Sequence, residues 1–492
     1  MNISPENIKR FAENQNVDLN EAVSRMRENF RDEFKGKEYV SKSDSLRRGQ
    51  ELREQIPLET HGQWKVEKDR VKAAALLQEQ EASRVQELIP LRHKRMSASP
   101  FAFYRGSAII MADDLATTPS TGINVQAVGD AHISNFGMFS SAERRLVFDI
   151  NDFDETLPGP WEWDVKRLMA SIEICGRDLS LSGKARRKAV YHAAKSYREA
   201  MLNFSDMGSL DVWYAHLDIA DQLAFHGTDM STEDRKAIRK ATEKALSRTS
   251  ASAVGKLTEV ADGKLRIKSD PPVLVPMRDL YKGEGGEEVM LDFISKMLTV
   301  YRHSLPRERR DLISQYKVVD AARKVVGVGS VGTKAWMVVL EGYPGGDPLV
   351  LQIKEANASV LERYLEKSHF AEHGRRVVEG QRAIQTAGDI LLGYIRIPTE
   401  KGYEDYYVRQ LWDGKGSVDL SKLSADSLMG VANLCAWTLA HAHAKTGNRH
   451  AIAGYLGQGK DFENAMTAFA DAYADQNEAD YEVFLRDACA DA

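Results

Sequence analysis

The sequence predicts an α+β protein with two lobes and a helical N-terminal extension. Two changes in residue pattern along the 492 positions lead to this prediction. Up to about residue 95 the chain is rich in charge, and apolar residues recur at helical spacing, as in DLNEAVSRM, residues 18–26. Further on, glycines break apolar runs, and near residue 320 the pattern becomes that of short strands. The expected divisions are a helical extension (1–95), a helical lobe built from two pieces (96–310 and 416–492) and a β-rich lobe (311–415).

Composition narrows the class of partner and compartment. Lysine and arginine number 67 against 72 acidic residues, so no overall basic field recommends a nucleic acid as partner. The three cysteines, Cys175, Cys435 and Cys489, are odd in number and far apart, which argues against a disulfide scaffold. The first residues lack the apolar stretch of a leader, and no uncharged apolar run approaches the ~18 residues that a membrane span needs. We expect a cytoplasmic protein that contacts no membrane.

The elements of the first half follow from local pattern. The runs INVQAVGD (123–130) and RRLVFDIND (144–152) are apolar, β-branched and short, so they predict buried strands that end in loops. After GPWEWD (159–164), apolar residues return at helical spacing as far as residue 204. The basic piece 231–268 is short of aromatic residues, and we interpret it as a solvated helix face.

The second half alternates strands and helices. Residues 325–342 and 348–356 flank a PGGD turn and predict two strands joined as a hairpin. A helix is expected from Ser359 to Ala387, two strands in ILLGYIRI and YEDYYVRQLW, and a further helix from Asp426 to Lys445.

The string GVGSVG, residues 327–332, fits the pattern G-x-G-x-x-G, which two kinds of nucleotide site use. A dinucleotide fingerprint would open a helix, whereas Gly327, Gly329, Ser330 and Gly332 lead into a strand. Strands on both sides of the glycines are typical of a kinase-type loop, whose backbone N–H groups close over nucleotide phosphates. A glycine-rich hairpin with no ligand is the competing interpretation.

A kinase-type loop requires a lysine on the following strand. LVLQIKEA places Lys354 in the position of the V-A-I-K lysine, which contacts the α- and β-phosphates. A glutamate on the next helix should hold this lysine, and Glu379 is the first candidate, with Glu372 and Glu366 as alternatives.

Two acidic stretches lie close together in GDAHISNFG (129–137) and FDINDFDE (148–155). Phosphoryl transfer requires an aspartate that accepts the acceptor's proton, an asparagine that holds magnesium and a second metal-binding aspartate. Asp130 and Asn135 have four residues between them, as in kinases, and Asp152 precedes Phe153 as the metal-binding aspartate should. Asp149 is an alternative or additional ligand, and Glu155 is interpreted as an N-cap or turn residue.

These motifs resemble known families. GDAHISNFG, FDINDFDE and GPWEWDVKRL are similar to motifs of aminoglycoside phosphotransferases and other protein-kinase-like enzymes, a resemblance that implies a buried structural role for Asp164. SPFAFYRG, NDFDE, VGVGSVGT, LQIKEA and EGQRAIQ, together with these motifs, resemble a bacterial family known as domain of unknown function 2252, from about residue 88 to the C-terminus. Because the acidic motifs precede the glycine loop, the resemblance implies a circularly permuted kinase-like fold. Val128 departs from the pattern, since such loops carry histidine there.

The function expected from these residues is ATP- and Mg²⁺-dependent phosphoryl transfer to an unidentified acceptor. Gly327, Gly329, Gly332 and Lys354 would hold the phosphates, Asn135 and Asp152 the metal, and Asp130 the acceptor's proton. Transfer of AMP and a nucleotide-binding pseudokinase are alternatives. A metal-dependent phosphoesterase is another, in which His132 joins Asp130, Asp149 and Asp152, with His450 as an imperfect further ligand. Arg95 and Arg105 flank the acidic loop and could meet an anionic substrate or form ordinary surface pairs.

Overall fold

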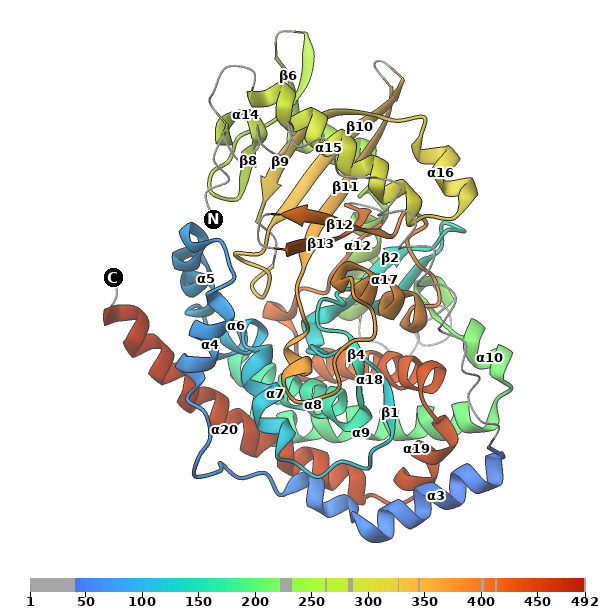
Figure 1. Ribbon diagram of the computed structural model, residues 1–492. Coiled ribbons are helices and arrows are strands. Elements are labelled where there is room, and N and C mark those ends of the chain that lie inside the picture. The colour runs from blue at the N-terminus through green and yellow to red at the C-terminus, as the bar shows by residue number, and fades with distance from the viewer. Residues whose placement is uncertain are drawn as a thin grey trace.

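The computed structural model describes most of the chain as a mixed α+β fold, drawn in Figure 1. It describes residues 40–221, 232–261, 263–281, 286–325, 327–343, 346–399, 402–411 and 414–490. The helix expected within 18–26 lies outside these ranges. Figure 1 shows one large sheet at the top of the molecule and a group of long helices below it, with the N-terminal helices along one side. In the described part of the chain, no helix is both long and apolar enough to cross a membrane.

The large sheet has six antiparallel strands in the order β12-β13-β11-β10-β9-β8. Its strands are β8 (Leu274–Pro276), β9 (Lys317–Lys324), β10 (Ala335–Tyr343), β11 (Gly346–Ala356), β12 (Gly393–Thr399) and β13 (Gly402–Gln410). The expected hairpin is β10 and β11, whose register pairs Ala335 with Lys354.

Helices cover both faces of this sheet, so its central strands are buried on each side. Along β10, Val338 and Leu340 share one apolar cluster with α15 (Gly286–His303). Met337 and Val339 point to the opposite face and pack in a second cluster with α13 (Ser250–Leu257). This alternation follows from the two-residue period of a strand.

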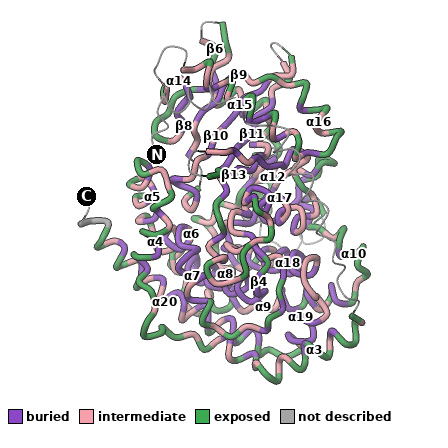
Figure 2. Tube along the Cα trace, viewed as in Figure 1, coloured by how far each residue is buried: buried purple, intermediate pink, exposed green. Residues whose placement is uncertain are grey.

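The helical lobe surrounds the largest apolar core. Its helices are α8 (Trp161–Asp178), α9 (Gly183–Asp206), α18 (Ala425–Thr446), the short α19 (Arg449–Leu456) and α20 (Asp461–Ala490). Serine N-caps begin two of them, because the Ser182 hydroxyl accepts the N–H of Ala185 and that of Ser424 accepts the N–H of Ser427. Figure 2 shows the buried residues gathered along α8, α9 and α18. The helix expected from Asp426 to Lys445 is confirmed.

The other described elements form small sheets, further helices and 3₁₀ turns. The small sheets are β1–β4 (Asn124–Ala127 and Leu157–Pro160), β2–β3–β5 (Phe136–Ser140, Leu146–Ile150 and Leu217–Asp218) and β6–β7 (Thr258–Ala261 and Lys264–Ile267). The remaining α-helices are α6 (Pro100–Gly106), α7 (Ala108–Ala116), α10 (Ser209–Tyr214), α12 (Thr232–Leu246), α14 (Met277–Leu280), α16 (Arg307–Ile313) and α17 (His373–Ile384). Single 3₁₀ turns are η3 (Ile133–Asn135), η4 (Val360–Arg363) and η5 (Leu420–Lys422). The basic piece 231–268 therefore contains a hairpin as well as helices.

The N-terminal extension is helical over its described residues. It comprises α3 (Lys42–Gln55), η1 (Leu58–Gly62), α4 (Ala73–Glu81), η2 (Gln86–Leu88) and α5 (Ile89–Met96). In Figure 1, α3 lies beside α19 at the base of the helical lobe, while α4 and α5 rise toward the sheet.

One expected helix is shorter than its sequence pattern suggested. Instead of a helix from Ser359 to Ala387, the chain forms η4, a loop and then α17. The Ser359 hydroxyl donates to the carbonyl oxygen of Glu155, and the Glu155 carboxylate accepts the N–H of Val360. Ser359 is the N-cap of η4, and these contacts fix the start of that turn against Glu155. Glu155 itself lies in a turn, as one of the two expected roles required.

The buried ion pair between α9 and α20 gives a test of the helical lobe. Arg198 donates through Nε (2.9 Å) and Nη2 (2.7 Å) to Glu463, and both side chains are buried. Glu463→Ala leaves a buried guanidinium without its partner and is expected to lower the free energy of unfolding by about 3–5 kcal/mol. The control is Glu199→Ala on α9. Glu199 forms an exposed ion pair with Lys195 at 3.6 Å, and loss of this pair should lower the free energy of unfolding by less than about 1 kcal/mol. Urea unfolding curves compare the two, and equal midpoints would contradict the assigned role.

Candidate functional site

The loop of residues 128–135 is held from beneath by a buried aspartate on α8. Asp164 accepts the backbone N–H of Val128 at 2.6 Å and of Gly129 at 2.9 Å. His443 on α18 approaches Asp164 at 3.2 Å and is itself bonded to Tyr197. This is the structural position that the resemblance implied for Asp164, and it fixes the backbone from which Asp130 projects.

Asp130 is held by an arginine that the sequence motifs did not single out. Arg167, one turn after Asp164 on α8, donates to Asp130 Oδ1 through Nε (2.9 Å) and Nη2 (2.7 Å). The other oxygen, Oδ2, lies 3.7 Å from His132 Nε2. Burial is the main cause that lowers the pKa of His132 to about 4, so this ring is neutral at pH 7. Asp130 therefore keeps one carboxylate oxygen, Oδ2, that accepts no hydrogen bond from an arginine.

Asn135 is oriented by two carbonyl oxygens. Its Nδ2 donates to the carbonyl of Asp130 at 3.1 Å and to that of Asp152 at 2.9 Å. With both amide hydrogens engaged, the amide oxygen is the atom left to meet a cation. The N–H of Asn151 also donates to the Asn135 carbonyl at 2.9 Å, which joins the loop to the acidic segment 149–155.

Lys354 meets this acidic segment, although about two hundred residues separate them in sequence. Its buried Nζ lies 3.5 Å from Asp152 Oδ2 and forms a shorter ion pair with Asp154. Asp154 also accepts the Tyr407 hydroxyl at 2.9 Å and lies 3.4 Å from the Ser330 hydroxyl. Lys354 is 1% exposed whereas Asp152 is 40% exposed, so the carboxylate side of the pair is open to solvent.

The charges at this junction shift the pKa values in opposite directions. Partial burial opposes ionisation of Asp152, but Lys354, Arg409 and Lys415 outweigh it and lower the pKa of that carboxyl. Burial and the charge of Asp152 raise the pKa of Asp154. Arg409 and burial lower the pKa of Lys415 to about 7, because cations crowd this side of the cluster. Lys354, Arg409 and the partly protonated Lys415 therefore surround Asp152, and Lys354 is paired with both Asp152 and Asp154.

The glycine loop, residues 327–332, connects β9 to β10 as expected. Gly327 and Gly332 have positive φ angles, 29° and 90°, which glycine adopts without strain. Ser330 lies within the loop, directed at Asp154.

The carbonyl oxygens of this loop are bound by the N-terminal extension. Arg92 Nη1 donates to Gly329 at 3.0 Å, and Arg95 Nη1 donates to Gly327 at 3.2 Å. Arg84 Nη1 donates to Val331 at 2.7 Å. Arg95 is thus engaged with the loop backbone. The arginines thus bind three carbonyl groups of the loop, and within the loop the Val331 N–H donates to the Val328 carbonyl at 3.3 Å.

Two groups of expected site residues do not join the cluster. Glu379 pairs with Arg382 at 2.9 Å, and the ion-pair partners of Lys354 in the described ranges are Asp152 and Asp154. The expectation that Glu379 holds Lys354 is therefore wrong for this structure. Arg382, three residues further along α17, takes the Glu379 carboxylate, while Arg376 of the same helix donates to the carbonyls of Thr156 and Asp154.

The two alternative glutamates, which lie in the described part of the chain, do not pair with Lys354 either. Glu366 is exposed, and Glu372 is buried with Oε2 unbonded. Asp149 is buried beside Lys445 and the N–H of Thr386, and burial raises its pKa to about 6.

Magnesium would find oxygen ligands at one place in the cluster. Asp152 Oδ1 is buried and accepts no hydrogen bond, and the Asn135 amide is turned by the carbonyl of the same Asp152. Across the described residues, no three His, Cys, Asp or Glu side chains are grouped to hold a metal ion. One carboxylate and one amide fit Mg²⁺, because this ion binds through one or two protein oxygens plus phosphates and water.

The histidines expected of a two-metal phosphoesterase do not converge. His450 Nδ1 is hydrogen-bonded to the Ser205 hydroxyl at 2.9 Å, between α19 and α9. Burial lowers the pKa of His450, and the carboxylate that opposes this shift is Asp206. His132 remains beside Asp130.

Gly129 gives a test of the loop geometry. It has φ +80°, and a Cβ there would lie 2.8 Å from the Glu155 carbonyl carbon. Gly122 also has a positive φ, +69°, but its Cβ would meet nothing within 4 Å. Gly122→Ala should cost about 1–2 kcal/mol of backbone strain, and Gly129→Ala about 1–3 kcal/mol more because Glu155 must move. Thermal unfolding of both variants measures the difference, and equal losses would show that the close approach does not constrain the loop.

Comparisons with known proteins give one match. No curated protein and no solved structure matches the chain. A family model described as "Uncharacterized protein conserved in bacteria (DUF2252)" matches residues 84–487, a stretch that contains the loop 128–135, the acidic segment, the glycine loop and Lys354. The chain belongs to this bacterial family.

Proposed function

We propose that this protein is an ATP- and Mg²⁺-dependent phosphotransferase with a kinase-like site. The proposal rests on the position of the Lys354 ammonium. Its Nζ lies 3.5 Å from Asp152 Oδ2 and forms an ion pair with Asp154. In a phosphoryl-transfer site, the lysine on the strand after the glycine loop contacts the phosphates. The aspartate after the catalytic-type loop holds the metal bound to the same phosphates, so the two residues must lie close together. Their proximity across two hundred residues supports a shared role.

The proposed roles follow from the contacts of each residue. Loop N–H groups between Gly327 and Gly332 and the ammonium of Lys354 bind the phosphates. Burial tends to lower the pKa of Lys354, but Asp152 and Asp154 raise it, so the ammonium stays charged. Phosphate oxygens would replace Asp154 as a partner of Lys354.

Asn135 and Asp152 are the proposed magnesium ligands. When bound, the ion would neutralise charge on the β- and γ-phosphates and on the group being transferred.

Asp130 is proposed to accept the proton of the acceptor hydroxyl. Arg167 fixes the orientation of this carboxylate through Oδ1 and leaves Oδ2 toward the open side. Neutral His132 does not neutralise Oδ2 at pH 7, so the oxygen can take a proton.

A circularly permuted kinase-like fold is part of the proposal. The chain passes first through the loop 128–135 and α8, then through the sheet with Lys354, and returns through residues 414–416 to α18. The Met138 N–H donates to the Gly416 carbonyl at 2.8 Å, so the returning strand joins β2 next to the acidic loop. This supports a rearranged order of parts, which proteins tolerate when the new connections lie at the surface.

The role of Asp130 is tested with Asp130→Asn, which keeps an oxygen for Arg167. Loss of the proton acceptor is expected to lower the turnover of ATP by about 10²- to 10⁴-fold while binding of MgATP changes little. Isothermal titration measures binding, and release of label measures turnover. Turnover equal to that of the wild type would exclude the role of Asp130.

The position of the label identifies the reaction. Incubation with γ-labelled and α-labelled ATP, with pooled metabolites and proteins as acceptors, should transfer only the γ-label. Transfer of the α-label would indicate an AMP-transferring enzyme. Tight MgATP binding without turnover would indicate a pseudokinase, and phosphate release from esters without ATP would indicate a phosphoesterase.

The metal site is tested by two matched aspartates of one segment. Asp152→Asn should remove most of the difference between ATP binding in Mg²⁺ and in EDTA, because it takes the charge from the proposed ligand. Asp149→Asn should keep this difference, since its carboxyl is buried beside Lys445 and Thr386. Titration of each variant with ATP under both conditions gives the measurement, and the opposite ranking would move the metal to Asp149.

A further inference from the structure

The C-terminal end of α6 is fixed to the glycine loop. Arg92 donates through Nη2 to the Gly106 carbonyl at 2.6 Å and through Nη1 to the Gly329 carbonyl at 3.0 Å. A Cβ on Gly329 would lie 3.2 Å from the carbonyl oxygen of Arg105. The backbone of Arg105 is therefore packed against the glycine loop.

The same end of α6 is also fixed to the loop 128–135. The Tyr104 ring lies 3.9 Å from the guanidinium carbon of Arg167, and the Tyr104 carbonyl accepts Arg167 Nη2 at 2.8 Å. Arg167 in turn holds Asp130. Arg105 is thus placed between the two loops that the proposed reaction requires to act together.

Arg105 differs from its neighbours in having no partner for its guanidinium among the described residues. Its Nε is buried and makes no hydrogen bond, and no carboxylate of the described chain forms an ion pair with it. The Phe101 ring lies 5.9 Å away. Burial lowers the pKa of Arg105, and the charge of Asp130 opposes this shift only in part. Arg92 and Arg167, by contrast, each hold a carboxylate.

The local charge is therefore positive beside Asp130. Arg167 already takes this carboxylate, and His132 is neutral at pH 7, so the charge of Arg105 is not balanced. A buried Nε–H without a hydrogen bond is unfavourable, and an oxyanion with two acceptor oxygens would bind it together with an Nη in the bidentate geometry that arginine favours.

We propose that Arg105 binds an oxyanion at the junction of the glycine loop and Asp130. The inference deepens the proposed phosphotransferase function and rests on it for the identity of the anion. That anion is either the phosphoryl group being transferred or an acidic substituent, phosphate or carboxylate, on the acceptor. In the first case Arg105 contacts the phosphoryl group that reacts. In the second it contacts an acidic substituent close to the acceptor hydroxyl at Asp130.

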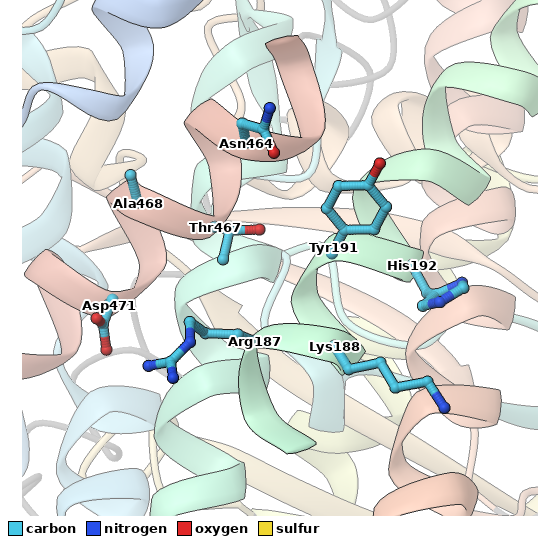
Figure 3. A pocket seen from close by; sticks show the side chains of 8 residues that line it. All are labelled: Arg187, Lys188, Tyr191, His192, Asn464, Thr467, Ala468 and Asp471. Carbon is cyan, nitrogen blue, oxygen red and sulfur yellow. The ribbon is translucent and has the colours of Figure 1, made fainter. Parts of the chain in front are cut away.

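A surface groove between α9 and α20 is the rival anion site. It has a volume of about 510 Å³ and is lined by Arg187, Lys188, Tyr191, His192, Asn464, Thr467, Ala468 and Asp471, which Figure 3 shows coming from these two helices. Arg187 and Lys188 are exposed, and Asp471 pairs with Arg177. Solvated cations of this kind bind anions weakly, so Arg187 serves as the control.

Binding of inorganic phosphate tests the inference. By isothermal titration, Arg105→Gln should weaken phosphate binding about tenfold or more, the effect of losing one charge-assisted hydrogen bond. Arg105→Lys should bind with intermediate affinity, because it keeps the charge and loses the fork, and Arg187→Gln should bind as the wild type does. Wild-type affinity in Arg105→Gln, or loss of binding in Arg187→Gln, would overturn the inference.

Two further measurements separate the explanations. Competition by a non-hydrolysable MgATP analogue but not by MgADP would assign the oxyanion to the transferred phosphoryl group, and phosphate binding alongside both nucleotides would assign it to the acceptor. If no nucleotide binds while phosphate still depends on Arg105, the phosphotransferase function fails and the anion site stands. Arg105→Gln should unfold at the wild-type temperature or above, whereas a lower temperature would show that Arg105 is structural and overturn the inference.

Discussion

The ion cluster of Lys354, Asp152 and Asp154 is the constraint on which the arrangement of the two lobes depends. A lysine buried to 1% exposure must have carboxylate partners, and here they come from a segment two hundred residues earlier. Hydrogen bonds to backbone carbonyls stabilise the same junction. Arg376 of α17 donates to the carbonyls of Asp154 and Thr156, at 2.8 and 2.6 Å. The β-rich lobe and the acidic segment are therefore one unit, and any change in the charge of the cluster acts on both.

Local pattern was sufficient for the hairpin of the large sheet and for placing Lys354 on one of its strands. The hairpin β10–β11 and Lys354 were predictable because strand alternation and turn composition are properties of neighbouring residues. The helix carrying Glu379 was also expected, but spacing along a helix leaves its rotation undetermined. In the structure Glu379 is half-buried and pairs with Arg382 of its own helix.

The residues that sequence reasoning missed are those whose role depends on distant contacts. Arg167 follows Asp164 by three positions and so shares its helix face, which was the one available signal that it could reach the loop above. Arg84 and Arg92 lie in an ordinary charged stretch, and only their hydrogen bonds to the loop 327–332 distinguish them. Because such contacts arise from tertiary folding, no periodicity within residues 80–96 predicts them.

The attachment of the glycine loop to α5 and to the turn after α4 has a consequence for how a bound molecule would leave. Arg84 and Arg92 hold two of its carbonyls, and the Val85 N–H holds a third, that of Gly332, at 2.8 Å. A loop fastened from outside cannot lift by itself to open an exit. If the protein binds a nucleotide as proposed, its departure would require either that the N-terminal helices move away together with the loop or that the nucleotide leaves on the opposite side, past Asp152. A shortened chain that begins after Met96 would lose this fastening and should exchange its ligands faster, with less control over their orientation.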